Sequence, residues 1–508
     1  MASSATPPGS SQTASLAPTR SAEVPMTQKI AFGVGMLGNQ MFPAALGVFM
    51  VVLVQSLGMD PWIAGVLAFL PRIFDAVTDP VMGYISDNTR SRWGRRRPYI
   101  FIGAILAGVS FALMWQLDAS NSQMHNFWYF LVLALAFYLG LTIFATPYVA
   151  MGYEMSSDFH ERTRIMAVAQ WIGQWAWVIA PWFWVIIYNP ELFPDPITGE
   201  ANGVVGARTL AVWVGIGCIA LAMTPAIFCR TQPVDPDTLD ELSIRGIGNS
   251  VGSLLGGVVA AFKNGPFVRI CVATFLIFGS FNTIAAFAYF IIVHYMFASS
   301  TDAAGRWPTW HGTVGALATT FLAIPIVTIM ATRLGKKTAF VISQSISMLG
   351  YAAFWWCFNP DDPRMLFLPL PLFCFGIGGL FTIMMSMTAD VCDLDELRTG
   401  SRSEGVFGAV YWWMVKLGFA VAGLATGVIM SSVGFDPNAE QQSETALTGL
   451  RLAYTIVPIA GAALAIFVML GYDLDEANAG EIRRELAERH AASATSASPP
   501  DQTQSEGP

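Results

Sequence analysis

Charge is what this sequence has least of. Only 12% of its 508 residues are Asp, Glu, Lys or Arg, whereas 54% are apolar. A soluble protein carries about 25% charged residues. A chain with so few charges cannot cover itself with a water-compatible surface, so lipid must cover much of it. The formal net charge of −8 does not change this conclusion, because nearly all the charges lie between apolar runs.

Motifs for metal binding and catalysis are also missing. The six cysteines form no CxxC pair, and five of them lie inside apolar runs, which is typical of small packing residues. The sequence has no P-loop, HExxH or GxSxG, and GIGG at residues 376–379 lies in an apolar segment, where it is expected to serve helix packing. We therefore predict that the chain is not an enzyme, needs no cofactor and has no nucleic-acid partner.

Long apolar runs are what the sequence does contain. A membrane-spanning helix needs about 20 mostly apolar residues. Twelve segments meet this description: 29–56, 62–86, 98–117, 127–152, 165–188, 209–229, 267–297, 311–332, 338–358, 366–388, 405–432 and 451–472. We expect a polytopic α-helical protein of the cell membrane, with the lipid bilayer as its main partner.

Lys and Arg residues orient these spans, because cytoplasmic loops carry an excess of them. If both termini are cytoplasmic, most of the 27 Lys and Arg residues fall in inside segments, and the outside loops hold only Arg208, Arg306 and Arg364. This bias favours an even number of spans and cytoplasmic termini. Residues 1–25 are rich in Ser, Ala, Thr and Pro and have no apolar stretch typical of a signal peptide.

Two landmarks recur along the chain and divide the spans into halves. RWGRR (92–96) follows the second span and RLGKK (333–337) the eighth. Acidic segments at 153–164 and 389–400 follow the fourth and tenth spans. The two acidic segments lie nearly as far apart along the chain as the two basic loops do. Two six-helix halves with a solute site between them form the major facilitator fold. We predict a disordered cytoplasmic tail (1–28), a six-helix bundle (29–229), a cytoplasmic connector (230–266), a second six-helix bundle (267–472) and a cytoplasmic tail (473–508).

Ionisable residues within spans are expensive to bury and are therefore functional candidates. Arg72, Asp75 and Asp79 are spaced by three and four residues, which places them on one helix face. The two carboxylates could bind Na⁺ or accept a proton, with Arg72 as a charge partner; the alternative is a self-neutralising structural cluster. Lys416, in the middle of the eleventh span, is expected to pair with the two acids, unless it extends towards the membrane surface.

Uncharged polar and aromatic side chains at membrane depth are candidates for substrate binding. Asn39, Gln40 and Gln170 could hydrogen-bond a polyhydroxylated ligand, or could equally bond neighbouring helices. Trp171 and Trp413 lie close to these positions and could stack on a sugar ring, although tryptophan near a span end usually anchors at the membrane interface.

Two stretches of the chain resemble a known family. DAVTDPVMGYISDNTRSRWGRRRP (75–98) and TADVCDLDELRTGSRSEGVFGAVYWWMVKLG (388–418) are similar to segments of the glycoside–pentoside–hexuronide:cation symporters, the melibiose permease group. Residues 145–164 match more weakly, and the resemblance runs from about 28 to 472. It implies a cation site made of Asp75, Asp79 and Thr142, with Lys416 as the span 11 lysine.

The family's sugar-binding positions match poorly. Gln40 stands where the resemblance implies an aspartate in span 1, Ala145 replaces a span 4 aspartate, and Gln170 replaces a span 5 arginine. Val149 stands in place of a tryptophan. These differences disfavour galactoside specificity, whereas another glycoside is compatible with the sequence.

We predict a sugar or glycoside:cation symporter, coupled to Na⁺ or H⁺ and working as a monomer by alternating access. Basic and acidic groups beside the repeated loops are expected to act as a cytoplasmic gate, or else to be solvated loop charges: Asp87, Arg92, Arg95, Arg96, Glu154, Asp158, Arg333, Lys336 and Asp390. The alternatives are a carrier of a lipid-like solute or organic acid, and a non-transporting membrane sensor on the same fold.

Overall fold

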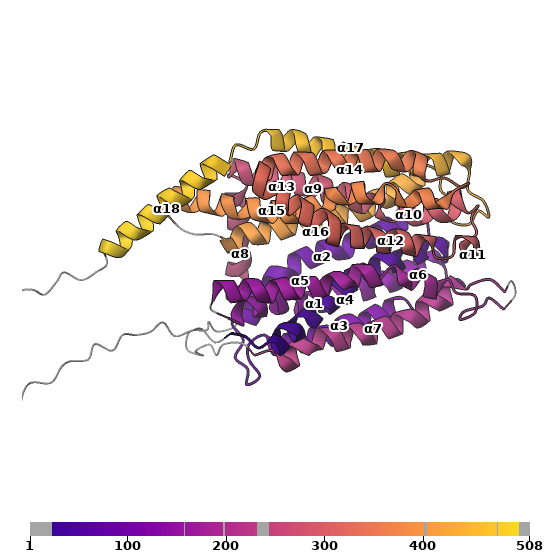
Figure 1. The fold of residues 1–508 in the computed structure, drawn as a ribbon. Coiled ribbons are helices and arrows are strands. Elements are labelled where there is room, and N and C mark those ends of the chain that lie inside the picture. Colours follow the sequence, from indigo (N-terminus) through magenta and orange to yellow (C-terminus); the bar gives the residue numbers. More distant parts are fainter. Residues whose placement is uncertain are drawn as a thin grey trace, which may run out of the picture.

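The computed structural model describes residues 23–156, 158–196, 199–230, 243–400, 404–474 and 476–496. These residues form helices joined by short connections, and the strand-like pairing found among them is an isolated bridge between Pro194 and Ala201. Figure 1 shows the long helices running side by side in two groups, the first half of the chain below the second.

Within the described part of the chain, the first group contains seven helices, and the helices of the second group are interrupted by π-helical and 3₁₀ turns. The first group consists of α1 (Met26–Gln55), α2 (Pro61–Asp87), α3 (Arg97–Met114), α4 (Gln123–Glu154), α5 (Phe159–Ile179), α6 (Trp182–Ile187) and α7 (Gly203–Phe228). The second consists of α9 (Gly265–Ala285), α10 (Phe287–Phe290), η2 (Ile291–Met296), α11 (Thr301–Ala304), α12 (Trp307–Ala318), η3 (Thr319–Ala323), α13 (Ile324–Leu334), α14 (Lys336–Cys357), η4 (Pro363–Phe367), α15 (Leu370–Thr399), α16 (Glu404–Ser432) and α17 (Glu444–Leu470).

The all-helical membrane fold predicted from the sequence is confirmed. Each of the twelve expected segments is helical, and ten helical segments of the described residues are long and apolar enough to cross a membrane. The other two expected spans, α5 with α6 and α14, run along the same bundle (Figure 1). These two spans are less apolar because they contain polar side chains. Helix α14 contains Ser343 and Gln344, and the first turns of α5 are charged.

Several predicted helix boundaries were wrong. The tenth span continues as α15 to Thr399 instead of ending at 388, because residues 389–399 contain no glycine or proline; Gly400, with φ 73°, ends the helix. The fifth span is broken between α5 and α6 at Pro181, which has no backbone N–H to continue the helix. Helix α1 begins at Met26, within the segment expected to be a disordered tail.

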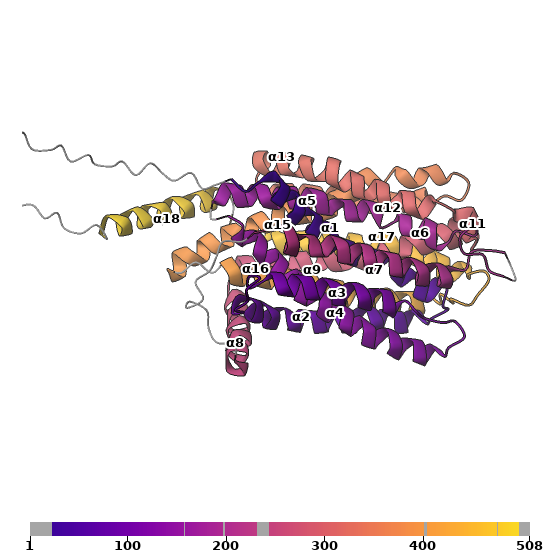
Figure 2. The ribbon, with the colours of Figure 1, turned by 90° about the horizontal axis from the view of Figure 1, so that it is seen from below.

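The described residues form two further helices outside the bundle of spans. Helix α8 (Ile244–Ala261) lies in the expected connector and packs against α2 and α16. Figure 2 shows it running across the bundle rather than along it. Helix α18 (Glu476–Ser496) lies in the expected C-terminal tail. Residues 1–22, 231–242, 475 and 497–508, which belong to the predicted tails and connector, lie outside the described residues.

Small residues allow the membrane helices to pack closely. A Cβ at Gly103 would lie 2.4 Å from the backbone nitrogen of Phe144, so α3 and α4 are in backbone contact there. Within GIGG, a Cβ at Gly376 or Gly379 would lie 2.4 Å from the hydroxyl of Ser347 or Ser343 on α14. The prediction that GIGG serves helix packing is therefore confirmed.

The two halves meet at the end of the bundle opposite to α18, which we call the far end; the end nearer α18 is the terminal end (Figure 1). Thr309 on α12 donates a hydrogen bond to the Pro181 carbonyl (2.9 Å), and Thr313 donates to the Val178 carbonyl (3.3 Å). His294 in η2 lies 2.8 Å from the Gln55 amide oxygen at the end of α1. These contacts, which we call the seam, hold the far ends of the halves together.

Candidate functional site

A charged cluster joins the two halves within the bundle. Helix α2 contributes Asp75 and Asp79, and α16, from the other half, contributes Lys416. The Lys416 ammonium lies 2.8 Å from the Asp75 carboxylate and forms a second ion pair with Asp79. Asp75 is buried, with 6% of its surface exposed. The pairing expected for Lys416 is therefore present, and one side chain links both carboxylates across the halves.

Threonine hydroxyls from α4 complete the cluster. Thr142 donates a 2.7 Å hydrogen bond to Asp75, and Thr146, one turn further on, donates to Asp79 at 3.4 Å. Thr78 on α2 lies 3.2 Å from the Thr142 hydroxyl. Neither Thr146 nor Thr78 was predicted as a site residue. The signal for Thr146 was available, because its four-residue step from Thr142 matches the step from Asp75 to Asp79.

The chemistry of this cluster suits a small cation. With both acids ionised and Lys416 protonated, the three groups carry a net charge of −1, so a monovalent cation can neutralise them. Their remaining atoms are carboxylate and hydroxyl oxygens, the ligands that hard cations prefer. A carboxylate at membrane depth can alternatively take up a proton. The cluster therefore has the charge and the oxygen atoms needed to hold either Na⁺ or a proton.

Arg72 is placed differently from what the sequence suggested. Its guanidinium lies over the ring of Phe419 on α16, 4.4 Å from the centroid, and near the ring of Tyr138. Among the residues that the structure describes, no carboxylate forms an ion pair with it. The cation–π contact takes the place of the expected charge pairing. A cavity of about 50 Å³ lies beside Arg72, enough for a water molecule.

The predicted substrate residues lie on three helices and are not joined to one another by hydrogen bonds in the described part of the chain. Gln40 on α1 packs close to Gly173 on α5. Trp171 and Gln170 on α5 are exposed, and Trp413 on α16 precedes Lys416 by one turn and is 38% exposed. The Asn39 amide lies 3.8 Å from the sulfur of Met36 within α1. Their substrate-binding role stays a prediction.

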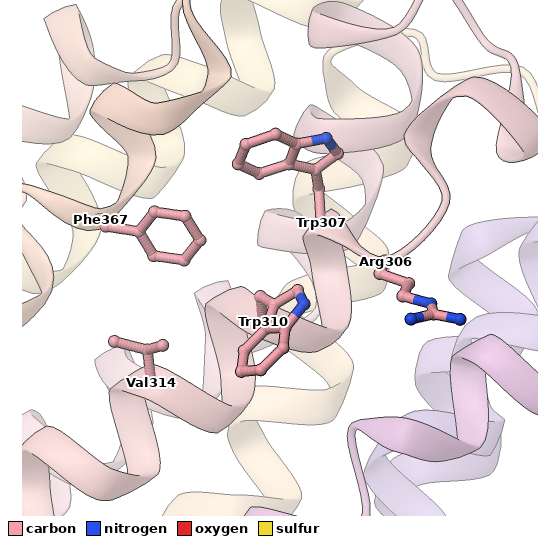
Figure 3. A pocket seen from close by; sticks show the side chains of 5 residues that line it. All are labelled: Arg306, Trp307, Trp310, Val314 and Phe367. Atoms are coloured by element: carbon pink, nitrogen blue, oxygen red, sulfur yellow. The ribbon is translucent and has the colours of Figure 1, made fainter.

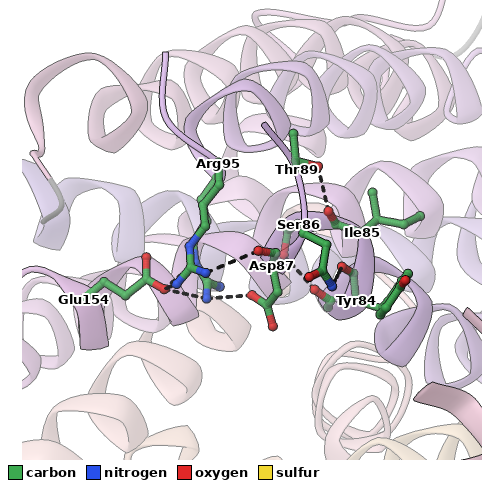
Figure 4. A network of polar contacts seen from close by, with 10 residues as sticks. Tyr84, Ile85, Ser86, Asp87, Thr89, Arg95 and Glu154 are labelled. Atoms are coloured by element: carbon green, nitrogen blue, oxygen red, sulfur yellow. Dashed lines mark hydrogen bonds and ion pairs between the residues drawn. The ribbon is translucent and has the colours of Figure 1, made fainter. Parts of the chain in front are cut away.

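The first repeated loop binds its own half at the terminal end. Arg96 forms ion pairs with Asp87 at the end of α2 and with Glu154 at the end of α4, each at 2.7 Å. Arg95 also pairs with Glu154 and donates to the Asp87 carbonyl at 3.2 Å. Figure 4 shows Arg95 between Glu154 and Asp87. The loop therefore ties α2, α3 and α4 together.

The second loop repeats this arrangement in the other half. Lys336 at the start of α14 pairs with Asp390 on α15 at 2.5 Å, as Arg95 pairs with Glu154. Arg97 donates to the Ala226 carbonyl at the end of α7, and Lys337 donates to the Leu470 carbonyl at the end of α17. Basic groups thus bind the carboxyl ends of the last helix of each half, where the helix dipole favours them.

Three of the predicted gate residues do not take part in these pairs. Asp158 accepts a hydrogen bond from the backbone N–H of Glu161 and so caps α5. Arg92 and Arg333 are exposed, and no ion pair of either is found in the described part of the chain. Sequence analysis also missed the buried ion pair between Lys29 and Glu161 (2.7 Å), which joins the starts of α1 and α5.

Two helical groups, repeated loops and a charged cluster between the groups define a membrane transporter of the major facilitator class. The chain belongs to the family described as MFS/sugar transport protein, which matches residues 31–476. The protein is accordingly a transporter rather than an enzyme. It is 26% identical to the putative glycoside/cation symporter YagG of Escherichia coli (strain K12), over 92% of this chain and 96% of that protein.

Other relatives are also similar over most of their length. An isoprimeverose transporter of Lactiplantibacillus pentosus is 23% identical, over 85% of each chain. Among solved structures, a bacterial homolog of the human lysosomal transporter Spinster, in an inward-facing and unoccupied conformation, aligns with a TM-score of 0.63 and 13% identity. That alignment covers 90% of this chain and 97% of the other, and it supports the fold.

Proposed function

We propose that this protein imports an uncharged sugar or glycoside by symport with Na⁺ or H⁺, through alternating access of the two halves. The observation that carries the proposal is the position of Lys416. This lysine on one half pairs with Asp75 and Asp79 on the other. A cation that competes for these carboxylates therefore acts directly on a contact between the halves.

The coupling step follows from the charges of the cluster. Without a cation, Lys416 partly neutralises Asp75 and Asp79. A bound Na⁺, or a proton on one carboxylate, weakens the hold of Lys416 because it supplies the positive charge that the acids need. The released Lys416 then lets α16 move relative to α2. Solute binding between the halves favours the same rearrangement, so cation and solute are transported together.

The cargo is inferred from the candidate substrate residues and the relatives. Gln40 and Gln170 can donate and accept hydrogen bonds, as sugar hydroxyls require, and neither carries charge. The named relatives include a putative glycoside/cation symporter and an isoprimeverose transporter. An anionic solute would need a cationic partner at these positions. Uncharged glycosides are therefore the class that we propose.

We further propose that the terminal end faces the cytoplasm and that the protein works as a monomer. Arg95, Arg96 and Lys336 gather at this end, in agreement with the excess of basic residues in cytoplasmic loops. The seam closes the far end, so this conformation corresponds to a transporter closed towards the outside. Both halves belong to one chain, so one chain supplies the complete cluster.

The test is uptake by the purified protein in proteoliposomes. A panel of labelled neutral glycosides is offered with an inward Na⁺ gradient, an inward H⁺ gradient or neither. We expect at least one glycoside to accumulate against its gradient with one of the ions, and an ionophore that collapses that ion gradient to abolish accumulation. Uptake that is indifferent to both gradients for every transported glycoside would reject symport.

A further inference from the structure

An aromatic pocket lies in the second half at the far end, away from the charged cluster. It has a volume of about 540 Å³ and is lined by Arg306, Trp307, Trp310, Val314 and Phe367. Figure 3 shows Phe367, from η4, facing the side chains of α12 across this space. The rings of Trp307 and Phe367 are 5.8 Å apart, and Trp310 is 43% exposed. The exposed wall is apolar, and Arg306 lies at the edge of the pocket with its guanidinium directed away from Phe367 (Figure 3).

The position of the pocket places it at the boundary between lipid and water. Arg306 directly precedes α12, and the helical segment Thr301–Leu334 that contains it is one of the candidate membrane spans. Tryptophan side chains at span ends lie at the level of lipid headgroups. A phospholipid can therefore reach this pocket with its acyl chains directed along α12 and its headgroup at Arg306.

Arg306 distinguishes this pocket from ordinary lipid-facing surface. No ion pair of Arg306 is found in the described part of the chain, and its exposed guanidinium is free to bind an anion. A second far-end groove, of about 710 Å³, is lined by Trp128, His125 and other side chains of α3 and α4 but by neither Lys nor Arg. The two sites share aromatic walls and differ in charge.

We propose that the pocket binds an anionic phospholipid, whose phosphate contacts Arg306 and whose acyl chain packs on Trp307, Trp310 and Phe367. The proposal is independent of the transported solute. Its location also gives it a structural consequence. Trp310 packs edge-to-face on Trp182 of α6, with ring centroids 5.3 Å apart, so a bound lipid lies directly beside the seam between the halves.

A photo-crosslinking experiment on the full chain tests this proposal at the site itself. Phosphatidylglycerol carrying a diazirine in one acyl chain is added to the purified protein, and labelled peptides are identified by mass spectrometry. We expect labelling of residues 301–318. Unlabelled phosphatidylglycerol should compete with the probe about fivefold better than phosphatidylcholine with the same acyl chains, because one basic residue strengthens binding of an anionic lipid by about this factor. Arg306→Gln removes this preference, and Trp307→Ala weakens competition by both lipids.

The second groove serves as the internal control. Peptides covering residues 113–133 should be competed equally by the two lipids, and Trp128→Ala should leave labelling of residues 301–318 unchanged. Circular dichroism of each variant checks that it is folded. The proposal is overturned if the two lipids compete equally at residues 301–318 in the native protein, or if Arg306→Gln keeps the preference.

Discussion

Lys416 shows how far single residues could be interpreted from sequence. Because charge is rare in the spans, a lysine at residue 416 and acids at 75 and 79 were conspicuous, and their mutual pairing followed from the need to neutralise them. The structure shows that pairing. It also shows Arg72 against Phe419, which sequence could not indicate because three-residue spacing does not fix the direction of a long side chain.

Replacing Lys416 by Met tests the electrostatic part of the account. The change leaves Asp75 and Asp79 without the ammonium group that they share. In buffer without Na⁺ we expect the free energy of unfolding to fall by about 2 kcal/mol, because breaking a partly buried pair leaves an uncompensated charge. Added Na⁺, or acid, should restore most of this loss, because either neutralises the carboxylates. Thermal unfolding of the purified variant measures both effects.

Lys337 provides the matched control. Its ammonium binds the backbone carbonyls of Leu470 and Tyr472 and has no role at the charged cluster. Lys337→Met should therefore lower stability by an amount that Na⁺ does not restore. Equal rescue of the two variants by Na⁺ would show that the ion stabilises the protein elsewhere.

At the scale of helices and turns, the repeated loops were predictable and the helix ends were not. The glycines of RWGRR and RLGKK have φ 92° and 83°, a conformation that favours glycine, which explains why both loops keep it. The end of α15 depended on Gly400 rather than on hydropathy, so counting apolar residues stopped the helix too early. The identity of the gate pairs also required coordinates, because Asp158 was equally acidic but caps α5.

Close packing of α2 and α16 gives a prediction at this scale. A Cβ at Gly427 on α16 would lie 2.3 Å from the Pro61 carbonyl oxygen and 3.0 Å from the Cα of Gly65 on α2. Gly427→Ala should therefore push the far ends of α2 and α16 apart. A cysteine placed in the seam should then be labelled about twofold faster or more, if the substitution destabilises the closed far end by roughly 0.5–1 kcal/mol. The labelling rate with a membrane-impermeant maleimide is the measurement.

Gly408, on the same helix, is the control for this change. No atom lies within 4 Å of a Cβ built there, so Gly408→Ala should leave the labelling rate unchanged. Similar rates for Gly427→Ala and the native protein would contradict a role for this contact in closing the far end.

For the whole molecule, hydropathy was enough to predict an all-helical membrane architecture, because a membrane permits few backbone structures. The family, too, was visible in residues 75–98 and 388–418. The cargo was not, because Gln40 and Gln170 differ from the residues that the resemblance implied, and amides can bind either a solute or a neighbouring helix. The contacts between the halves at the far end, such as that of Thr309 with the Pro181 carbonyl, likewise became visible only in the structure.

Asp118 provides a control for transport measurements on variants of the cluster carboxylates. It lies at the far end, outside the spans. Hydrogen bonds from Ser120, and then the ion pair with Arg208, lower the pKa of its carboxylate to about 2. It is therefore ionised at any pH used for transport, so that Asp118→Asn removes a real charge without touching the cluster. Transport by this variant should match that of the native protein.

The most direct test of coupling at the cluster compares two activities of Asp75→Asn and Asp79→Asn in proteoliposomes. Each variant lacks one carboxylate that a cation would occupy. We expect accumulation driven by the Na⁺ or H⁺ gradient to fall at least about tenfold, the effect of losing roughly 1.4 kcal/mol of cation binding, while counterflow of labelled glycoside persists. If both variants accumulate glycoside as strongly as the native protein, the cation does not act at Asp75 and Asp79, and the account is wrong.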